Sequence, residues 1–166
     1  MCGIVGYLGN RVAQDALIDG LRRLEYRGYD SAGAAFHDGN AFSLARETGR
    51  VENLAATLRE SNPTSTLGIA HTRWATHGAV TVSNTHPHLS HDGKIALVHN
   101  GVIENYGPLK RILEGKGIEF SSETDSEVLS NLIAYHYARL EGEEEQFAQA
   151  LREALSQCRG AYGIAV

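Results

Sequence analysis

The sequence predicts an α+β or layered α/β domain. Short β-like runs alternate along the chain with amphipathic helical segments, and hairpin signals occur among them. The 166 residues suffice for one domain with a genuine core. Eighteen glycines against three prolines, many of them flanking the β-like runs, indicate tight turns more than flexible linkers.

The first half of the chain predicts two helices among four strands. Apolar residues recur at helical spacing from Ala13 to Leu24, which is typical of one buried helix face. Asp38-Gly39-Asn40 between two β-like runs is a strong hairpin signal. In chain order we expect a buried strand at 3–8, a helix at 12–24, strands at 31–37 and 41–46, a short helix at 51–59 and a strand at 67–73.

The second half predicts a strand, three helices and a final strand, after a long histidine-rich loop. Thr124 to Glu127 has the capping-box pattern that begins a helix. The expected elements are a strand at 95–99, helices at 105–117, from 124 to about 140 and at 144–157, and a strand at 160–166. Because the sequence stops inside that strand, we expect an incomplete sheet.

Composition excludes several classes of function. The net charge is −5 and the basic residues are scattered, so we expect no nucleic-acid partner. No apolar run is long enough to cross a bilayer, and the first ten residues lack the features of a secretion signal. The two cysteines lie 156 positions apart and do not resemble a disulfide framework, which favours a reducing cytoplasm.

Cys2 is the candidate nucleophile. Removal of Met1 would leave a thiol and a free amine on one residue, and an N-terminal amine titrates near ~7.7–8.0, so it can act as a base at neutral pH. By position alone, chance is the better explanation for a cysteine at residue 2. However, Gly3 and Gly6 bracket an apolar run that would hold the terminus in the core. Cys158 continues an apolar helical stripe, so we interpret it as packing.

Seven motifs then point to a family. Together they resemble the N-terminal glutaminase domain of the glutamine–fructose-6-phosphate aminotransferases (glucosamine-6-phosphate synthases), within the class II glutamine amidotransferases. The opening CGIVG is shared more widely in that class, whereas the second and third motifs point to the hexosamine enzymes. The motifs, in chain order, are MCGIVGYLG at 1–9, LEYRGYDSAG at 24–33, HTRWATHG at 71–78, NTHPH at 84–88, VHNGVIEN at 98–105, SETDSEV at 122–128 and RGAYGIAV at 159–166.

The resemblance implies a fold, a reaction and partners. The fold would be an N-terminal-nucleophile (Ntn) hydrolase four-layer αββα sandwich, of which residues 1–166 form an incomplete glutaminase domain. The reaction would be hydrolysis of the glutamine side-chain amide through a glutamyl thioester on Cys2, with no cofactor. The ammonia would pass to a sugar-isomerase domain outside this sequence, in a full-length protein that forms homo-oligomers.

The resemblance also implies roles in the chemistry for two adjacent residues. The Asn100 side-chain amide and the Gly101 backbone N–H match an oxyanion hole, where fixed donors stabilise developing negative charge. Without the match, Asn-Gly between apolar stretches is equally a favoured hairpin turn.

Further matched residues would recognise the substrate. Arg73 matches the partner of the α-carboxylate, for which a guanidinium fork is suited, and Thr76 and His77 would line the same end. Asp125 matches the partner of the substrate ammonium. Taken alone, Arg73 would be a surface charge, and Asp125 a carboxylate favoured by a helix dipole.

Three more matched residues would lie beside the pocket. Trp74 is the only tryptophan. Taken alone it would belong to the core, but by resemblance it lies on the glutamine loop and contributes to the passage of ammonia. Arg27 and Asp30 fall in a matching motif, and we expect them to support the pocket without taking part in the chemistry.

Three alternatives stay open. A metal site is conceivable because six histidines cluster within 29 residues, yet the spacing fits no standard zinc pattern, and no metal is expected. The chain would be a non-catalytic module if Met1 is retained. A different amidotransferase, such as the phosphoribosylamine-forming one, would share the nucleophile. The six histidines are His71, His77, His86, His88, His91 and His99.

Overall fold

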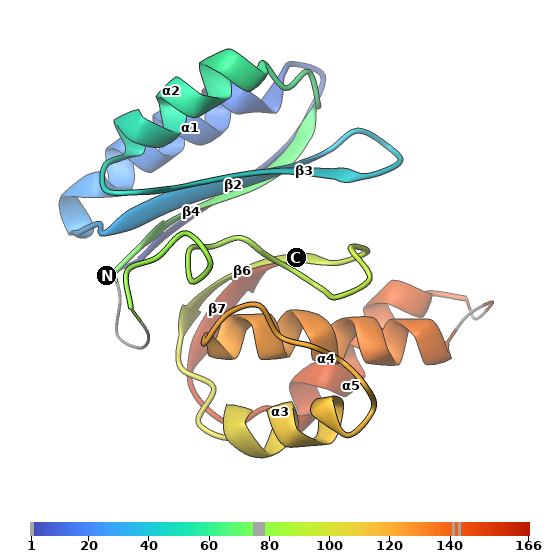
Figure 1. Ribbon diagram of the computed structural model, residues 1–166. Helices are drawn as coiled ribbons and strands as arrows, with labels where there is room; N and C mark the ends of the chain where they lie inside the picture. Colours follow the sequence, from blue (N-terminus) through green and yellow to red (C-terminus); the bar gives the residue numbers. More distant parts are fainter. Residues whose placement is uncertain (1, 75–78, 141, 143) are drawn as a thin grey trace.

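The fold is a sandwich of four layers, with two β-sheets face to face and helices covering the outer face of each (Figure 1). The computed structural model describes residues 2–74, 79–140, 142 and 144–166. The four-layer αββα arrangement expected from the resemblance is confirmed.

The first sheet contains four antiparallel strands in the order β1-β4-β2-β3. Helices α1 and α2 cover its outer face (Figure 1), and the buried faces of both helices join the sheet in one apolar cluster that includes Leu17, Leu54 and Phe36. These elements are β1 (Gly3–Leu8), α1 (Ala13–Leu24), a 3₁₀ turn η1 (Glu25–Arg27), β2 (Ser31–His37), β3 (Phe42–Thr48), α2 (Val51–Ser61) and β4 (Leu67–Arg73).

The second sheet has three strands in the order β5-β6-β7, and α3, α4 and α5 cover it from outside (Figure 1). A second apolar cluster fills the space between them, with Leu97, Leu113 and Ile133 fully buried. The elements are β5 (His88–Leu89), β6 (Ala96–Gly101), α3 (Tyr106–Glu114), α4 (Asp125–Arg139), α5 (Gln146–Gln157) and β7 (Tyr162–Ala165).

The described residues between β4 and β5 run between the two sheets (Figure 1). Gly33 in β2 shows how closely they approach, because a Cβ built there would lie 2.1 Å from the His86 carbonyl oxygen. Only glycine leaves room for that backbone, so the buried His86 lies directly against the first sheet.

Three predictions about these elements were wrong in detail. The strand at 3–8 is not buried throughout, because β1 lies at the edge of its sheet and Leu8 is exposed. The histidine-rich loop contains the two-residue strand β5. The last helix begins at Gln146 instead of residue 144, although it ends at Gln157 and Cys158 packs against the second apolar cluster, as predicted.

The capping box at the start of α4 is only half formed. The Thr124 side chain accepts from the Glu127 N–H at 3.2 Å, as predicted. The Glu127 carboxylate, however, does not return to the backbone of Thr124. It accepts hydrogen bonds from the N–H and hydroxyl groups of Ser121 and Ser122 at 2.6–2.8 Å, which fixes the loop before the helix.

Candidate active site

The ends of the two central strands, β4 and β6, meet beside the N-terminus around a cavity of about 330 Å³. The start of α4 forms a further wall. The cavity is lined by Cys2, Arg73, Trp74, His86, His99, Asn100, Gly101, Val102, Thr124, Asp125 and Ser126. The structure therefore brings together six of the residues that the resemblance singled out, from four separate parts of the chain.

Cys2 is fixed by the pairing of β1 with β4. The adjacent Gly3 pairs with Thr72 and donates its N–H to the Thr72 hydroxyl at 3.0 Å. The Cys2 sulfur accepts a hydrogen bond from the Trp74 N–H at 3.4 Å. Because the ladder fixes the backbone and an N–H contacts the sulfur, the side chain has a defined position in the cavity and does not fray with the terminus.

Arg73 brings a buried positive charge to the cavity. It is the last residue of β4, only 4% exposed, and its Nη1 donates to the Ala79 carbonyl oxygen at 3.2 Å. A buried guanidinium is favourable only where anionic or carbonyl oxygens meet its fork of donors. A carboxylate entering the cavity would supply such oxygens.

Asp125 brings the opposite charge. It is the first residue of α4, where the helix dipole favours a carboxylate, and its Oδ2 accepts from the Ile103 N–H at 2.8 Å. Both interpretations of Asp125 made from the sequence are thus compatible. The cavity carries a cationic and an anionic side chain, as the α-carboxylate and α-ammonium of an amino acid require.

Asn100 and Gly101 end β6 and do not form a hairpin turn. Gly101 still pairs with Tyr162 of β7, and its φ of 138° is accessible mainly to glycine. A Cβ on Gly101 would lie 2.3 Å from the Ala161 carbonyl oxygen. This glycine therefore allows β7 to approach while Asn100 and Gly101 both reach the cavity.

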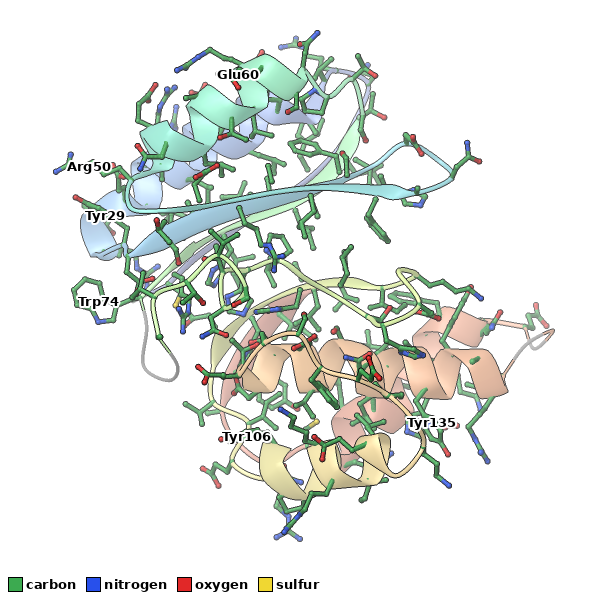
Figure 2. The ribbon with its side chains drawn as sticks, viewed as in Figure 1. Tyr29, Arg50, Glu60, Trp74, Tyr106 and Tyr135 are labelled. Atoms are coloured by element: carbon green, nitrogen blue, oxygen red, sulfur yellow. The ribbon has the colours of Figure 1, made fainter. Side chains whose placement is uncertain are left out.

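Trp74 lies at the mouth of the site and not in the core, with 52% of its surface exposed. Figure 2 shows it at the edge of the molecule. Its indole packs on Gly28, where a Cβ would lie 2.5 Å from Cε3 of the indole.

Arg27 and Asp30 do not line the cavity, but the Asp30 N–H donates to the Arg73 carbonyl oxygen at 2.8 Å, beside the site. Thr76 and His77 lie outside the described residues.

Four of the six clustered histidines are buried between the sheets. His71, His86 and His88 pack edge to face, with ring centroids 4.2 and 4.8 Å apart for successive pairs. Burial lowers the pKa of His71 and of His88 to about 3, and it also lowers the pKa of His86 and of His99. These rings are therefore neutral at physiological pH.

The described part of the chain contains no group of three or more histidine, cysteine, aspartate or glutamate side chains placed to hold a metal. Four of the histidines instead form hydrogen bonds to residues at the start of α4 or within it, namely His86, His88, His91 and His99. His91 is exposed and binds Asn131 through its backbone N–H and its ring, and His88 binds the Thr124 hydroxyl at 3.0 Å.

Sequence reasoning missed several residues that line the cavity. His86 and His99 entered the prediction only as members of the histidine cluster, whereas Val102, Thr124 and Ser126 were not singled out. The signal was present for two of them, because Thr124 and Ser126 flank Asp125 in the motif SETDSEV. Contact between distant segments, such as His86 with Ser126, leaves no trace in a single sequence.

A larger cavity of about 430 Å³ lies elsewhere, lined mainly by apolar side chains. His37 and Lys94 are its only ionisable residues. It offers neither a nucleophile nor a pair of opposite charges, so the cavity at Cys2 is the better candidate site for a reaction at an amide.

The four-layer fold, with a cysteine at its leading strand and donors and charges around it, defines the class of N-terminal-nucleophile amidohydrolases. Residues 58–162 match the family model described as the glutamine amidotransferase domain. The chain belongs to that family. No helix in the described residues has the length and hydropathy needed to cross a membrane.

Relatives agree with this assignment. The chain is 51% identical over 166 residues to a glutamine–fructose-6-phosphate aminotransferase (isomerizing) of Thermus thermophilus, covering all of this chain and 26% of that relative. The enzyme of the same name from Mycolicibacterium smegmatis is 53% identical over 146 residues, covering 84% of this chain and 23% of the relative. The chain thus spans about a quarter of the length of the curated relatives it matches.

A solved structure is similar as well. Glutamine phosphoribosylpyrophosphate amidotransferase from B. subtilis, complexed with ADP and GMP, superposes with a TM-score of 0.80 at 28% identity. The match covers 98% of this chain and 34% of that one. The N-terminal-nucleophile fold of class II glutamine amidotransferases is thereby confirmed.

Proposed function

We propose that this chain hydrolyses the side-chain amide of glutamine, with Cys2 as nucleophile. One observation carries the proposal: the Cys2 sulfur shares its cavity with Arg73 and Asp125, a buried cation and an anion. Glutamine presents a carboxylate, an ammonium and a carboxamide. The two charges would hold the amino-acid end and leave the carboxamide for the sulfur.

The reaction would proceed by acyl transfer. After Met1 is removed, the α-amine of Cys2 accepts the thiol proton while the sulfur attacks the carboxamide carbon. The Asn100 side-chain amide and the Gly101 N–H donate to the oxygen that becomes negative. The C–N bond then breaks, ammonia leaves with the transferred proton, and water hydrolyses the thioester to glutamate and free thiol.

Matched residues beside this centre would assist it. Thr76 and His77 would line the carboxylate end by resemblance, and Trp74 would cover the mouth through which ammonia leaves. Arg27 and Asp30 would support the strand ends without touching substrate, which agrees with the hydrogen bond between Asp30 and the backbone of Arg73.

In the complete gene product, the ammonia would convert fructose-6-phosphate to glucosamine-6-phosphate. The 51% identity to a glutamine–fructose-6-phosphate aminotransferase supports this acceptor. Residues 1–166 would form part of the glutaminase domain, and a sugar-isomerase domain would be its partner in a homo-oligomer. The two unpaired cysteines are compatible with a cytoplasmic location.

A phosphoribosylamine-forming enzyme is the second candidate, because a phosphoribosylpyrophosphate amidotransferase superposes with a TM-score of 0.80. Its identity to this chain is only 28%, so the first candidate is favoured. Assays of the complete gene product with glutamine and either fructose-6-phosphate or phosphoribosyl pyrophosphate would distinguish them.

The proposal is tested by treating the complete gene product, its N-terminus sequenced, with a glutamine-like diazo-ketone. We expect an N-terminal cysteine, release of glutamate from glutamine, and one covalent label on Cys2. Cys2→Ala should abolish glutamate release, and Cys158→Ala should retain it. Activity with Met1 still attached, or an active Cys2→Ala variant, would overturn the mechanism.

A further inference from the structure

Two buried imidazoles converge on one hydroxyl beside the cavity. The Ser126 Oγ lies 2.7 Å from Nε2 of His86 and 2.8 Å from Nδ1 of His99. It also lies 3.4 Å from Oδ1 of Asp125, which is 3.8 Å from the same nitrogen of His99. Ser126 is 1% exposed and His99 2%, so bulk solvent does not reach these contacts.

The hydroxyl has a single proton for three neighbours. A serine donates one hydrogen bond and accepts two, whereas a neutral imidazole carries one N–H and one bare nitrogen. Both rings are neutral, because burial lowers the pKa of His86 and of His99. The positions of the protons therefore depend on what the second nitrogen of each ring contacts.

Neither second nitrogen has a hydrogen-bond partner among the described residues. Nδ1 of His86 and Nε2 of His99 are both buried and unpaired. If Ser126 gave its proton to either ring, that ring would carry its own hydrogen on the unpaired nitrogen. A buried N–H without an acceptor is costly and rare, whereas a buried bare nitrogen is better tolerated.

Only one arrangement avoids a buried, unpaired N–H. Both rings then donate to Ser126, His86 from Nε2 and His99 from Nδ1, and the hydroxyl directs its proton to Asp125. A carboxylate strengthens a hydrogen bond that it accepts, which favours this direction even at 3.4 Å. Asp125 is thus held at both oxygens, since its Oδ2 accepts from the Ile103 N–H.

We propose that Ser126 is a positioning residue that receives protons from His86 and His99, donates to Oδ1 of Asp125, and so orients that carboxylate toward the substrate ammonium. The role of Asp125 in binding glutamine rests on the proposed function, whereas the proton positions are independent of it. The contact of 3.4 Å leaves Oδ1 with the capacity to bind an ammonium as well.

The proton positions can be seen directly by neutron diffraction from deuterated crystals of the complete gene product. We expect deuterium on Nε2 of His86 and on Nδ1 of His99, with the Ser126 deuterium directed to Asp125. Deuterium on Nδ1 of His86 or on Nε2 of His99 would overturn the proposal. This result does not depend on whether the protein hydrolyses glutamine.

Kinetics test the positioning role. Ser126→Ala should raise KM for glutamine about 10-fold with little change in kcat, because binding of the ammonium weakens before the acyl-transfer step is affected. Ser126→Thr, which keeps the hydroxyl, should restore KM. Ser130→Ala is the matched control: Ser130 is also fully buried on α4, but its hydroxyl binds the Leu89 and Glu127 carbonyl oxygens away from the cavity.

A double-mutant cycle completes the test. If Ser126 acts through Asp125, then Ser126→Ala should add less than 2-fold to KM in an Asp125→Asn background. An unchanged KM in Ser126→Ala, or equal effects in both backgrounds, would exclude positioning through Asp125. If the wild-type protein releases no glutamate at all, the proposed function fails, and the neutron result still decides the proton arrangement.

Discussion

The backbone N–H of Trp74 points at the sulfur of Cys2, with nitrogen and sulfur 3.4 Å apart. The two residues are separated by 72 positions in the sequence, and the pairing of β1 with β4 brings them together. Trp74 also packs on Gly28, and Figure 2 shows its side chain at the edge of the molecule. The residue that forms the mouth of the cavity therefore also positions the nucleophile.

The two thiols of the chain should differ strongly in reactivity. Burial raises the pKa of Cys158 to about 11, so only roughly 10⁻⁴ of it is thiolate at pH 7. Its Sγ also donates to the Ala154 carbonyl oxygen at 3.4 Å. We expect iodoacetamide at pH 7 to label Cys2 at least 10 times faster, as measured by peptide mass spectrometry over time. Equal rates would contradict the contrast between a cavity thiol and a packing thiol.

Asp125→Asn should weaken glutamine binding without unfolding the protein. The amide oxygen of the asparagine can still accept a hydrogen bond from the Ile103 N–H, which donates to Oδ2 of Asp125 at 2.8 Å in the wild-type protein. The negative charge for the ammonium is lost, and a hydrogen bond to a charged group contributes about 1.5–3 kcal/mol. We therefore expect kcat/KM for glutamine hydrolysis to fall roughly 10- to 150-fold. An unchanged kcat/KM would remove Asp125 from the substrate site.

The sequence predicted the elements well where the pattern is local. Turn signals and apolar spacing located the hairpin of β2 and β3, both helices that cover the first sheet, and the Thr124 cap of α4. Errors arose where tertiary contacts decide. Glu127 accepts hydrogen bonds from Ser121 and Ser122 instead of closing the capping box, because Ser122 of the preceding loop is buried against its carboxylate.

The candidate site was predicted from motifs and not from spacing. Cys2, Arg73 and Asp125 are far apart in the sequence, and only the resemblance grouped them. The histidines show the limit of single-sequence reasoning. His86 and His99 could be counted as a cluster, but their common contact with Ser126 depends on how the two sheets pack.

Gly101→Ala should destabilise the fold, and Gly163→Ala should not. Gly101 has φ of 138°, and a Cβ there would lie 2.3 Å from the Ala161 carbonyl oxygen and 2.7 Å from the Tyr162 Cα. The variant should lose about 1–3 kcal/mol of unfolding free energy or more, and glutaminase activity with it. Gly163 pairs with Asn100 on the facing strand and has open space for a Cβ. Urea unfolding of both variants measures the difference, and equal stability would contradict it.

The buried histidines should make the chain sensitive to mild acid. Burial lowers the pKa of His71 and of His88 to about 3, below the value near ~6.5 expected in the unfolded chain. The unfolded state therefore binds more protons, so the stabilisation is complete above pH 6.5 and is lost as the pH falls toward 3. In that window, each such histidine lowers the free energy of unfolding by about 1.4 kcal/mol for every pH unit by which the pH falls.

His88→Gln tests this dependence on pH. Glutamine can still bind the Thr124 hydroxyl, which His88 contacts at 3.0 Å through Nε2, but it does not titrate. Urea unfolding of the 166-residue chain, followed by circular dichroism from pH 7 to pH 4, should give a shallower loss of stability in the variant, by about 1.4 kcal/mol per pH unit. His91→Gln provides the matched control, because it replaces a histidine that the fold leaves exposed. An identical slope in wild type and His88→Gln would mean that His88 is not held neutral by the fold.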